Sequence, residues 1–88
     1  MPEVEIYTRA YCSYCEWALE LLRRKGVKFT EIDVTGNSEL RAAMTARANG
    51  QSKTPQIFID QAHIGGCDEL YALDDAGRLD SLLHFTKG

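Results

Sequence analysis

The sequence lacks a surplus of basic residues. Ten Lys and Arg stand against thirteen Asp and Glu in 88 residues, which gives a net charge of -3 and a pI near 5.3. Binding to nucleic-acid phosphates or to an anionic membrane requires a basic face that displaces counterions. The composition therefore argues against both kinds of partner.

Long apolar segments are also missing. Apolar runs such as Ile57–Ile59 are far shorter than the roughly 20 residues that cross a bilayer. Met1–Glu5 lacks the basic and apolar regions of a secretory signal peptide. We therefore expect a protein of the cytoplasm, where thiols stay reduced.

Cysteine is scarce, and the three residues present, Cys12, Cys15 and Cys67, are an odd number. A disulfide framework of the secreted kind is therefore not expected, and the thiols indicate redox chemistry, metal binding or packing. Internal repeats and linkers are absent as well. Residues 1–88 are expected to form a single domain with one modest core.

The hydrophobic pattern changes between strand and helix periods along the chain. The second strand slips out of phase after Phe29, which predicts a bulge or an exposed edge. The second helix is expected to bury a stripe of Leu40, Ala43 and Met44. Strands are predicted at 3–8, 27–34, 57–60 and 63–65, and helices at 12–25, between Gly36 and Gly50, at 68–73 and at 78–85.

This order predicts an α/β fold. A β-α-β start requires a parallel, right-handed crossover, and the short connection between the last two strands predicts an antiparallel hairpin. The expected architecture is a four-stranded mixed sheet flanked by helices on both faces.

Cys12-Ser13-Tyr14-Cys15 lies where the first strand leads into the first helix. Free N–H groups and the dipole at a helix N-terminus favour a thiolate at Cys12, and Arg9 adds a nearby cation. Cys15 lies one turn later and is expected to be more buried, yet close enough to form a disulfide. The pattern predicts Cys12 as the attacking thiol and Cys15 as the resolving thiol.

Packed thiols or half of a zinc site are the alternatives for this pair. A second cysteine pair at zinc-like spacing is missing, and only His63 and Cys67 could complete a site, at unusual spacing. Trp17 is expected to pack at the edge of the site, and His63 and His84 are weak candidates for metal binding or catalysis.

Two later segments could complete a site around the thiols. Pro55 stands at the entry of a strand, where it costs no ladder donor. Gly65-Gly66-Cys67-Asp68 opens a helix, and its glycines free the backbone to cradle a small carboxylate or peptide group. The alternative for this segment is a hairpin exit followed by a helix cap.

Together these segments resemble the glutaredoxin family, and the likeness covers nearly the whole chain. It is carried by Ile6-Tyr7-Thr8 before the Cys12–Cys15 motif, by Thr54-Pro55-Gln56-Ile57-Phe58-Ile59, and by His63-Ile64-Gly65-Gly66-Cys67-Asp68-Glu69-Leu70. The sequence looks most like the small bacterial dithiol glutaredoxin 3 type. The resemblance implies a thioredoxin-like fold with Pro55 in cis. It also implies a cytoplasmic thiol–disulfide oxidoreductase with glutathione as co-substrate, acting on protein disulfides and glutathione mixed disulfides.

The resemblance also implies a glutathione site. The backbone of Thr54 would pair with the cysteinyl group, Cys67 and Asp68 would hold the γ-glutamyl end, and Arg9 and Lys53 would meet the glycyl carboxylate. Tyr14 would flank the thiol, and the Pro55 loop and Gly66 would complete the site.

Two positions depart from the family pattern. Ser13 stands where the dithiol motif usually has Pro, and Lys53-Thr54-Pro55 stands where Thr-Val-Pro is usual. Some family members with Ser in the motif bind a [2Fe-2S] cluster, so an alternative function is a dimer in which Cys12 and glutathione from each protomer hold such a cluster. The leading interpretation is a monomer without metal.

Overall fold

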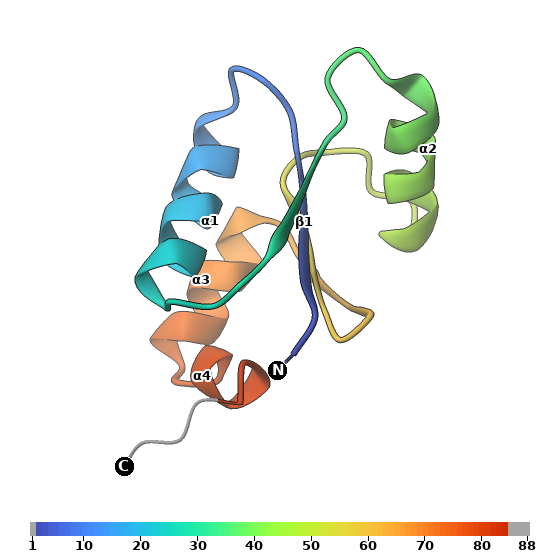
Figure 1. Ribbon diagram of the computed structural model, residues 1–88. Coiled ribbons are helices and arrows are strands. Elements are labelled where there is room, and N and C mark those ends of the chain that lie inside the picture. Colours follow the sequence, from blue (N-terminus) through green and yellow to red (C-terminus); the bar gives the residue numbers. More distant parts are fainter. Residues whose placement is uncertain (1, 85–88) are drawn as a thin grey trace.

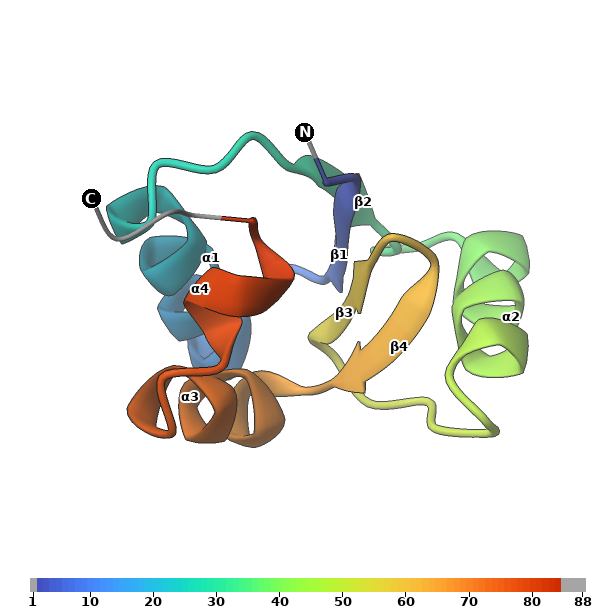
Figure 2. The same ribbon diagram turned by 90° about the horizontal axis from the view of Figure 1, so that it is seen from below.

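The computed structural model describes residues 2–84 and contains one mixed sheet with helices on both sides (Figures 1 and 2). The strands lie in the order β2-β1-β3-β4, with β2 parallel to β1 and the other neighbouring pairs antiparallel. The strands are β1 (Val4–Thr8), β2 (Thr30–Asp33), β3 (Gln56–Ile59) and β4 (Ala62–Gly65), and the helices are α1 (Ser13–Arg24), α2 (Ser38–Arg47), α3 (Cys67–Asp75) and α4 (Leu79–Leu82). This is the α/β architecture that the sequence pattern predicts.

Helix α1 is helical because its apolar residues recur on one face. Ala18 and Leu22 are fully buried on that face, and Arg23 and Arg24 occupy the last turn, where the helix dipole favours cations. The helices α1, α3 and α4 cover one face of the sheet and enclose the larger core (Figure 2). Helices α1 and α3 contact each other directly, and the hydroxyl of Tyr71 on α3 donates to the carbonyl oxygen of Trp17 on α1 at 2.9 Å.

Among the elements of residues 2–84, only α2 covers the other face of the sheet. Its N-cap is Asn37, whose side chain accepts a hydrogen bond from the N–H of Leu40 at 3.0 Å. Met44 is buried as expected, but Ala43 is exposed, and Ala48 is the further apolar residue that packs against the sheet. The expected stripe was wrong at Ala43. Residues four apart lie on the same side of a helix, so Ala48 shares the buried side with Met44, whereas Ala43, one residue before Met44, faces away.

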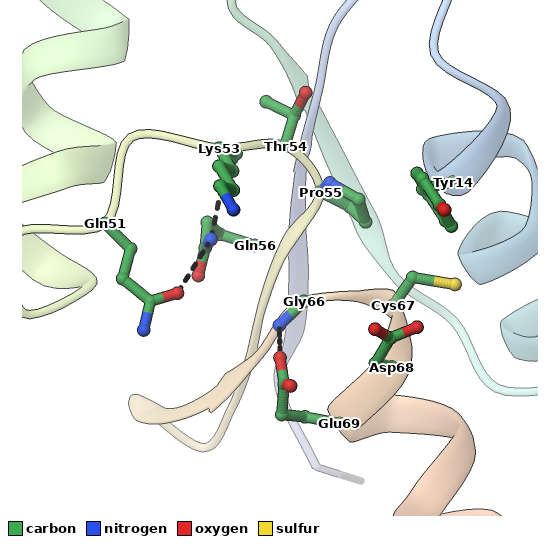
Figure 3. Close-up of a pocket in the computed structure, with 10 residues that line it drawn as sticks. All are labelled: Tyr14, Gln51, Lys53, Thr54, Pro55, Gln56, Gly66, Cys67, Asp68 and Glu69. Atoms are coloured by element: carbon green, nitrogen blue, oxygen red, sulfur yellow. Dashed lines mark hydrogen bonds between the residues drawn. The ribbon is translucent and has the colours of Figure 1, made fainter.

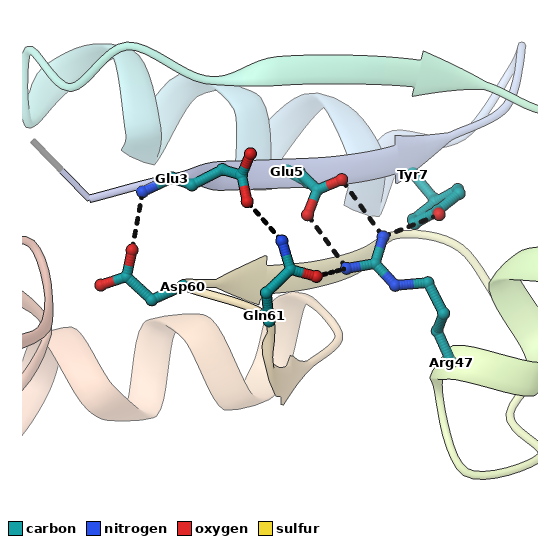
Figure 4. A network of polar contacts seen from close by, with 6 residues as sticks. All are labelled: Glu3, Glu5, Tyr7, Arg47, Asp60 and Gln61. Atoms are coloured by element: carbon teal, nitrogen blue, oxygen red, sulfur yellow. Dashed lines mark hydrogen bonds and ion pairs between the residues drawn. The ribbon is translucent and has the colours of Figure 1, made fainter.

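Arg47 fixes α2 to the sheet (Figure 4). Its guanidinium forms a two-pronged ion pair with Glu5, at 3.0 and 3.2 Å, and donates to the hydroxyl of Tyr7 at 2.9 Å. The same group stacks over the ring of Phe58, 4.1 Å from its centroid. Because the guanidinium bonds β1 and covers β3, it ties the helix to the two central strands.

The second strand is shorter than the predicted 27–34. Only Thr30–Asp33 pairs with β1, while Val27 and Val34 are buried outside the ladder. β2 is an exposed edge, as one of the two alternatives predicted, and the irregular pairing lies instead between Ile57 and Phe58 of the β3–β4 hairpin.

The C-terminal helices differ from the prediction in length. Helix α3 begins one residue earlier and ends two residues later than 68–73, and α4 covers only Leu79–Leu82. The predicted helix end at Phe85 lies outside the described residues. No helix within residues 2–84 has the length and apolarity needed to span a membrane.

Candidate active site

The N-terminus of α1 carries the first thiol. Cys12 is the N-cap residue in an extended conformation, and its Sγ accepts a hydrogen bond from the N–H of Cys15 at 3.2 Å. The thiol therefore takes the place that Ser or Asp usually fills at a helix start. It is half-buried, so an incoming sulfur atom can reach it.

The loop before β3 supplies the other contacts of Cys12. The hydroxyl of Thr54 donates to Sγ at 3.7 Å, and the carbonyl oxygen of Thr54 lies 3.7 Å from Sγ as an acceptor. The Nε of Arg9 donates to the same hydroxyl at 3.2 Å. Thr54 thus offers an acceptor to the neutral thiol and a donor to the thiolate.

These contacts lower the pKa of Cys12. Burial acts in the opposite direction, but the hydrogen bonds from Cys15 and Thr54 and the positive charge of Arg9 outweigh it. The local geometry therefore favours the thiolate, which is the nucleophilic form of cysteine.

Cys15 has the opposite character. Only 2% of it is exposed, and burial together with the hydrogen bond to Cys12 raises its pKa to about 11. The two thiols of one motif are thus distinguished by position: one ends the loop and meets solvent, and the other lies inside the first helical turn. The predicted asymmetry of burial is present.

The N-terminus of α3 forms the opposite wall. Gly66 lies so near the cis Thr54–Pro55 bond that an added Cβ would come 3.3 Å from the carbonyl oxygen of Pro55. Gly65 has φ of +123°, and a Cβ there would meet the side chain of Glu69 at 2.8 Å. A side chain at Gly65 would thus be strained by the positive φ and crowd Glu69, and one at Gly66 would crowd the Pro55 loop.

A groove of about 340 Å³ lies between this wall and the loop (Figure 3). Figure 3 shows the Sγ of Cys67 on the side of the groove nearest Tyr14. Burial, with the negative charges of Asp68, Cys12 and Glu69, raises the pKa of Cys67. The residues that line this 340 Å³ groove are Tyr14, Gln51, Lys53, Thr54, Pro55, Gln56, Gly66, Cys67, Asp68 and Glu69.

A second groove of about 420 Å³ shares Tyr14, Lys53 and Thr54 with the first. It adds Arg9 and Cys12 to the cavity surface. All the predicted glutathione-binding residues therefore line two adjoining grooves, with the Cys12 thiol in one of them. Cys15 lines neither and lies beneath, in the first turn of α1.

Several lining residues were not singled out from the sequence. Arg41 reaches the second groove from α2, and its Nη2 donates to the carbonyl of Ser52 at 2.9 Å. Glu69 accepts the N–H of Gly66 at 2.7 Å. The position of Arg41 at the groove follows only from tertiary packing. The Gly66–Glu69 contact could have been predicted, because a Glu three residues after a helix cap is a recognisable sequence signal.

Two aromatic side chains, Tyr11 and Tyr14, line the groove that contains Cys12. Tyr14 and Trp17 form an edge-to-face pair with centroids 5.6 Å apart, as expected for packing at the edge of the site. Tyr11, which was not predicted, is fully exposed and has φ of +58°.

The described residues contain no group of three or more His, Cys, Asp and Glu side chains arranged to hold a metal ion. His63 instead contacts Asn49 and Gln56, and His84 lies 3.5 Å from Asp60. An iron–sulfur cluster would therefore need ligands from outside one protomer besides Cys12.

Comparison with known proteins agrees with this geometry. A family model described as glutaredoxin matches residues 4–64. Glutaredoxin 3 of Escherichia coli is 54% identical, over 94% of this chain and 99% of that protein. The solution structure of a Brucella melitensis glutaredoxin is 57% identical, with a TM-score of 0.81 over 92% of this chain and 87% of that one. A buckwheat glutaredoxin–glutathione complex is 26% identical, with a TM-score of 0.85 over 94% and 77% of the two chains. The chain therefore belongs to the glutaredoxin family of thiol–disulfide oxidoreductases.

Proposed function

We propose that this glutaredoxin uses glutathione to reduce glutathione mixed disulfides and protein disulfides, with Cys12 as nucleophile and Cys15 as resolving thiol. The observation that carries the proposal is the contrast between the two thiols. The pKa of Cys12 is lowered at an accessible groove, whereas that of Cys15 is raised to about 11 beneath it. A nucleophile and a resolving group need this difference.

The first reaction needs only Cys12. Its thiolate attacks the glutathione sulfur of a mixed disulfide, the new Cys12–glutathione disulfide forms, and the target leaves as a thiolate that takes a proton from water. A second glutathione thiolate then attacks the bound glutathione sulfur. Oxidised glutathione leaves, and the Cys12 thiolate is regenerated.

A protein disulfide requires Cys15 as well. Attack by Cys12 releases one target sulfur and leaves the other bound to Cys12. Cys15 loses its proton and attacks the Cys12 sulfur, which frees the second target sulfur and forms the Cys12–Cys15 disulfide. Two glutathiones restore both thiols and leave as oxidised glutathione. Once Cys12 is in a disulfide its negative charge no longer opposes ionisation of Cys15.

The two grooves suit the parts of glutathione. The N–H groups of Cys67 and Asp68 lie in the first turn of α3, where they have no acceptor within the helix, and they would meet the γ-glutamyl carboxylate. The carboxylate of Asp68 would meet the γ-glutamyl ammonium group. Arg9 and Lys53 at the other end would bind the glycyl carboxylate, and the Thr54 backbone would pair with the cysteinyl group.

The partners we propose are glutathione and proteins that carry a disulfide or a bound glutathione. The glutathione named in the buckwheat complex supports the first of these by analogy. A reducing cytoplasm fits a reaction that consumes reduced glutathione, and there the protein would act as a monomer in electron transport and redox homeostasis.

A glutathione-coupled assay tests the proposal. Purified protein is given a glutathionylated peptide, reduced glutathione, glutathione reductase and NADPH, and consumption of NADPH is followed. The wild-type protein should turn over, and Cys12→Ser should not. Wild-type protein without turnover above the uncatalysed rate would overturn the proposed function.

A further inference from the structure

The amide of Gln56 is a buried polar group at the start of β3. Only 1% of the residue is exposed. Its Nε2 donates to the carbonyl oxygen of Lys53 at 2.9 Å and lies 3.5 Å from the Oε1 of Gln51 (Figure 3). Its Oε1 lies 2.6 Å from the Nε2 of His63 on β4. The side chain therefore joins the hairpin to the loop that precedes Pro55.

The hydrogen-bond chemistry fixes the direction of this link. The Lys53 carbonyl can only accept, so the NH₂ of Gln56 must face it and the amide oxygen must face His63. His63 must then carry a hydrogen on Nε2. In the neutral ring, Nδ1 accepts from the Nδ2 of Asn49 at 3.3 Å.

Packing holds the imidazole in place. The ring of His63 lies against that of Phe58, with centroids 5.1 Å apart and planes tilted by 35°. A half-buried ring with one face on an aromatic neighbour and both nitrogens in hydrogen bonds has little freedom to turn away from Gln56.

The loop held in this way carries the contacts of the nucleophile. Thr54 follows Lys53 directly, and its hydroxyl and carbonyl are the groups within 3.7 Å of the Cys12 Sγ. Gln51, Ser52 and Lys53 are exposed, so apolar packing does not fix them. On the outer side Arg41 bonds the carbonyl of Ser52, and on the inner side Gln56 bonds that of Lys53.

We propose that Gln56 and His63 are positioning residues, which together hold the Lys53 carbonyl so that Thr54 keeps its contacts with the Cys12 sulfur. This inference rests on the proposed role of Cys12 as nucleophile. It predicts that the imidazole contributes to thiol reactivity without touching substrate or thiol, through one amide and one backbone carbonyl.

Three variants test the link. Gln56→Leu removes the amide, and His63→Phe keeps an aromatic ring on Phe58 but loses the donor. His63→Gln is the matched control, because its amide nitrogen is the same number of bonds from the backbone as Nε2 and can donate to Gln56.

The primary measurement is the rate at which iodoacetamide alkylates Cys12 at pH 7, read by mass spectrometry of the Cys12 peptide. Gln56→Leu and His63→Phe should react about 3-fold to 10-fold more slowly, the value of one weakened hydrogen bond to the thiolate. His63→Gln should stay within about twofold of wild type. Long-range ¹H–¹⁵N spectra of the wild type should show the hydrogen of His63 on Nε2.

The reactivity separates positioning from a general loss of stability. Variants that unfold at lower denaturant but alkylate at the wild-type rate would overturn the inference, as would equal rates for His63→Phe and His63→Gln. If Gln56→Leu does not fold, the His63 pair decides alone. Alkylation needs no glutathione, so wild-type protein that fails the glutathione-coupled assay refutes the proposed function while these rates still test the link.

Discussion

Replacing Cys15 by serine should separate the two reactions. With a pKa of about 11, Cys15 is a thiolate in only about one molecule in ten thousand at pH 7. It therefore adds nothing as a competing nucleophile in the reduced protein. In this variant the backbone N–H of residue 15 still donates to the Cys12 Sγ. The serine hydroxyl can also replace the Cys15 thiol, which is the second donor to Cys12. Reduction of a glutathionylated peptide should keep at least about half of the wild-type rate.

Protein disulfides should respond differently to the same change. Without a resolving thiol, the target remains attached to Cys12 until glutathione attacks, so turnover of a protein disulfide should fall at least about tenfold at limiting glutathione. The measurement compares both substrates with wild type, Cys15→Ser and Cys12→Ser under identical conditions. If Cys15→Ser lowered the turnover of both substrates by the same factor, Cys15 would not act only as the resolving thiol, and the assignment would be refuted.

Three further predictions concern charge, packing and the helix start. Arg9→Glu and Lys53→Glu should raise the KM for glutathione more than they lower kcat, because both cations line the grooves; an equal rise for the exposed control Lys28→Glu would contradict this. Leu22→Ala should lower the free energy of unfolding in urea by about 2–5 kcal/mol, because Leu22 is fully buried; a loss under 1 kcal/mol, about the cost of a surface change, would place it outside the core. Protein prepared anaerobically with iron, sulfide and glutathione should contain some brown [2Fe-2S] dimer. Ser13→Pro should suppress this dimer while reductase activity remains, because proline stiffens the first turn of the helix. A colourless wild-type monomer would exclude the cluster function.

The fold could be read from the sequence where one periodicity dominates. The helical spacing of Ala18 and Leu22 predicts α1 because these residues share one buried face. The short Ile57–Ile59 run predicts β3 as a strand that is buried on both faces of the sheet. The pattern fails at Val27 and Val34, which are buried but lie beyond the ends of β2, although the N–H of Val34 still donates to the carbonyl oxygen of Thr8. Burial and ladder membership are separate properties, and residue type reports only the first.

The turn between β3 and β4 shows a second limit. Asp60 and Gln61 both have positive φ, of 49° and 70°, as a two-residue hairpin requires. Asn or Gly is usual at such positions, and Gln61 gives no such signal. Here hydrogen bonds hold the turn in place of the usual turn residues: Asp60 accepts the N–H of Glu3, and the side-chain amide of Gln61 bonds both Glu3 and Arg47 (Figure 4).

The site was predictable where it is local and where the family motif covers it. The Cys12–Cys15 motif stands between a strand pattern and a helix pattern, so the sequence shows that a thiol lies at a helix start. A helix N-terminus lowers the pKa of such a thiol, so the reactive cysteine could be predicted. The inner support of the loop was not predicted. Gln56 and His63 meet only across two paired strands, and the polar residue at the head of an apolar strand was the single sequence sign that a buried partner exists.

The most direct test of the account is to locate the bound glutathione. Cys15→Ser protein is incubated with oxidised glutathione at pH 7, and the modified peptide is identified by mass spectrometry. The account predicts one glutathione on Cys12, removed by added reduced glutathione, and none on Cys67. Modification of Cys67 in preference to Cys12, or no adduct on either thiol, would contradict the assignment of Cys12 as the nucleophile.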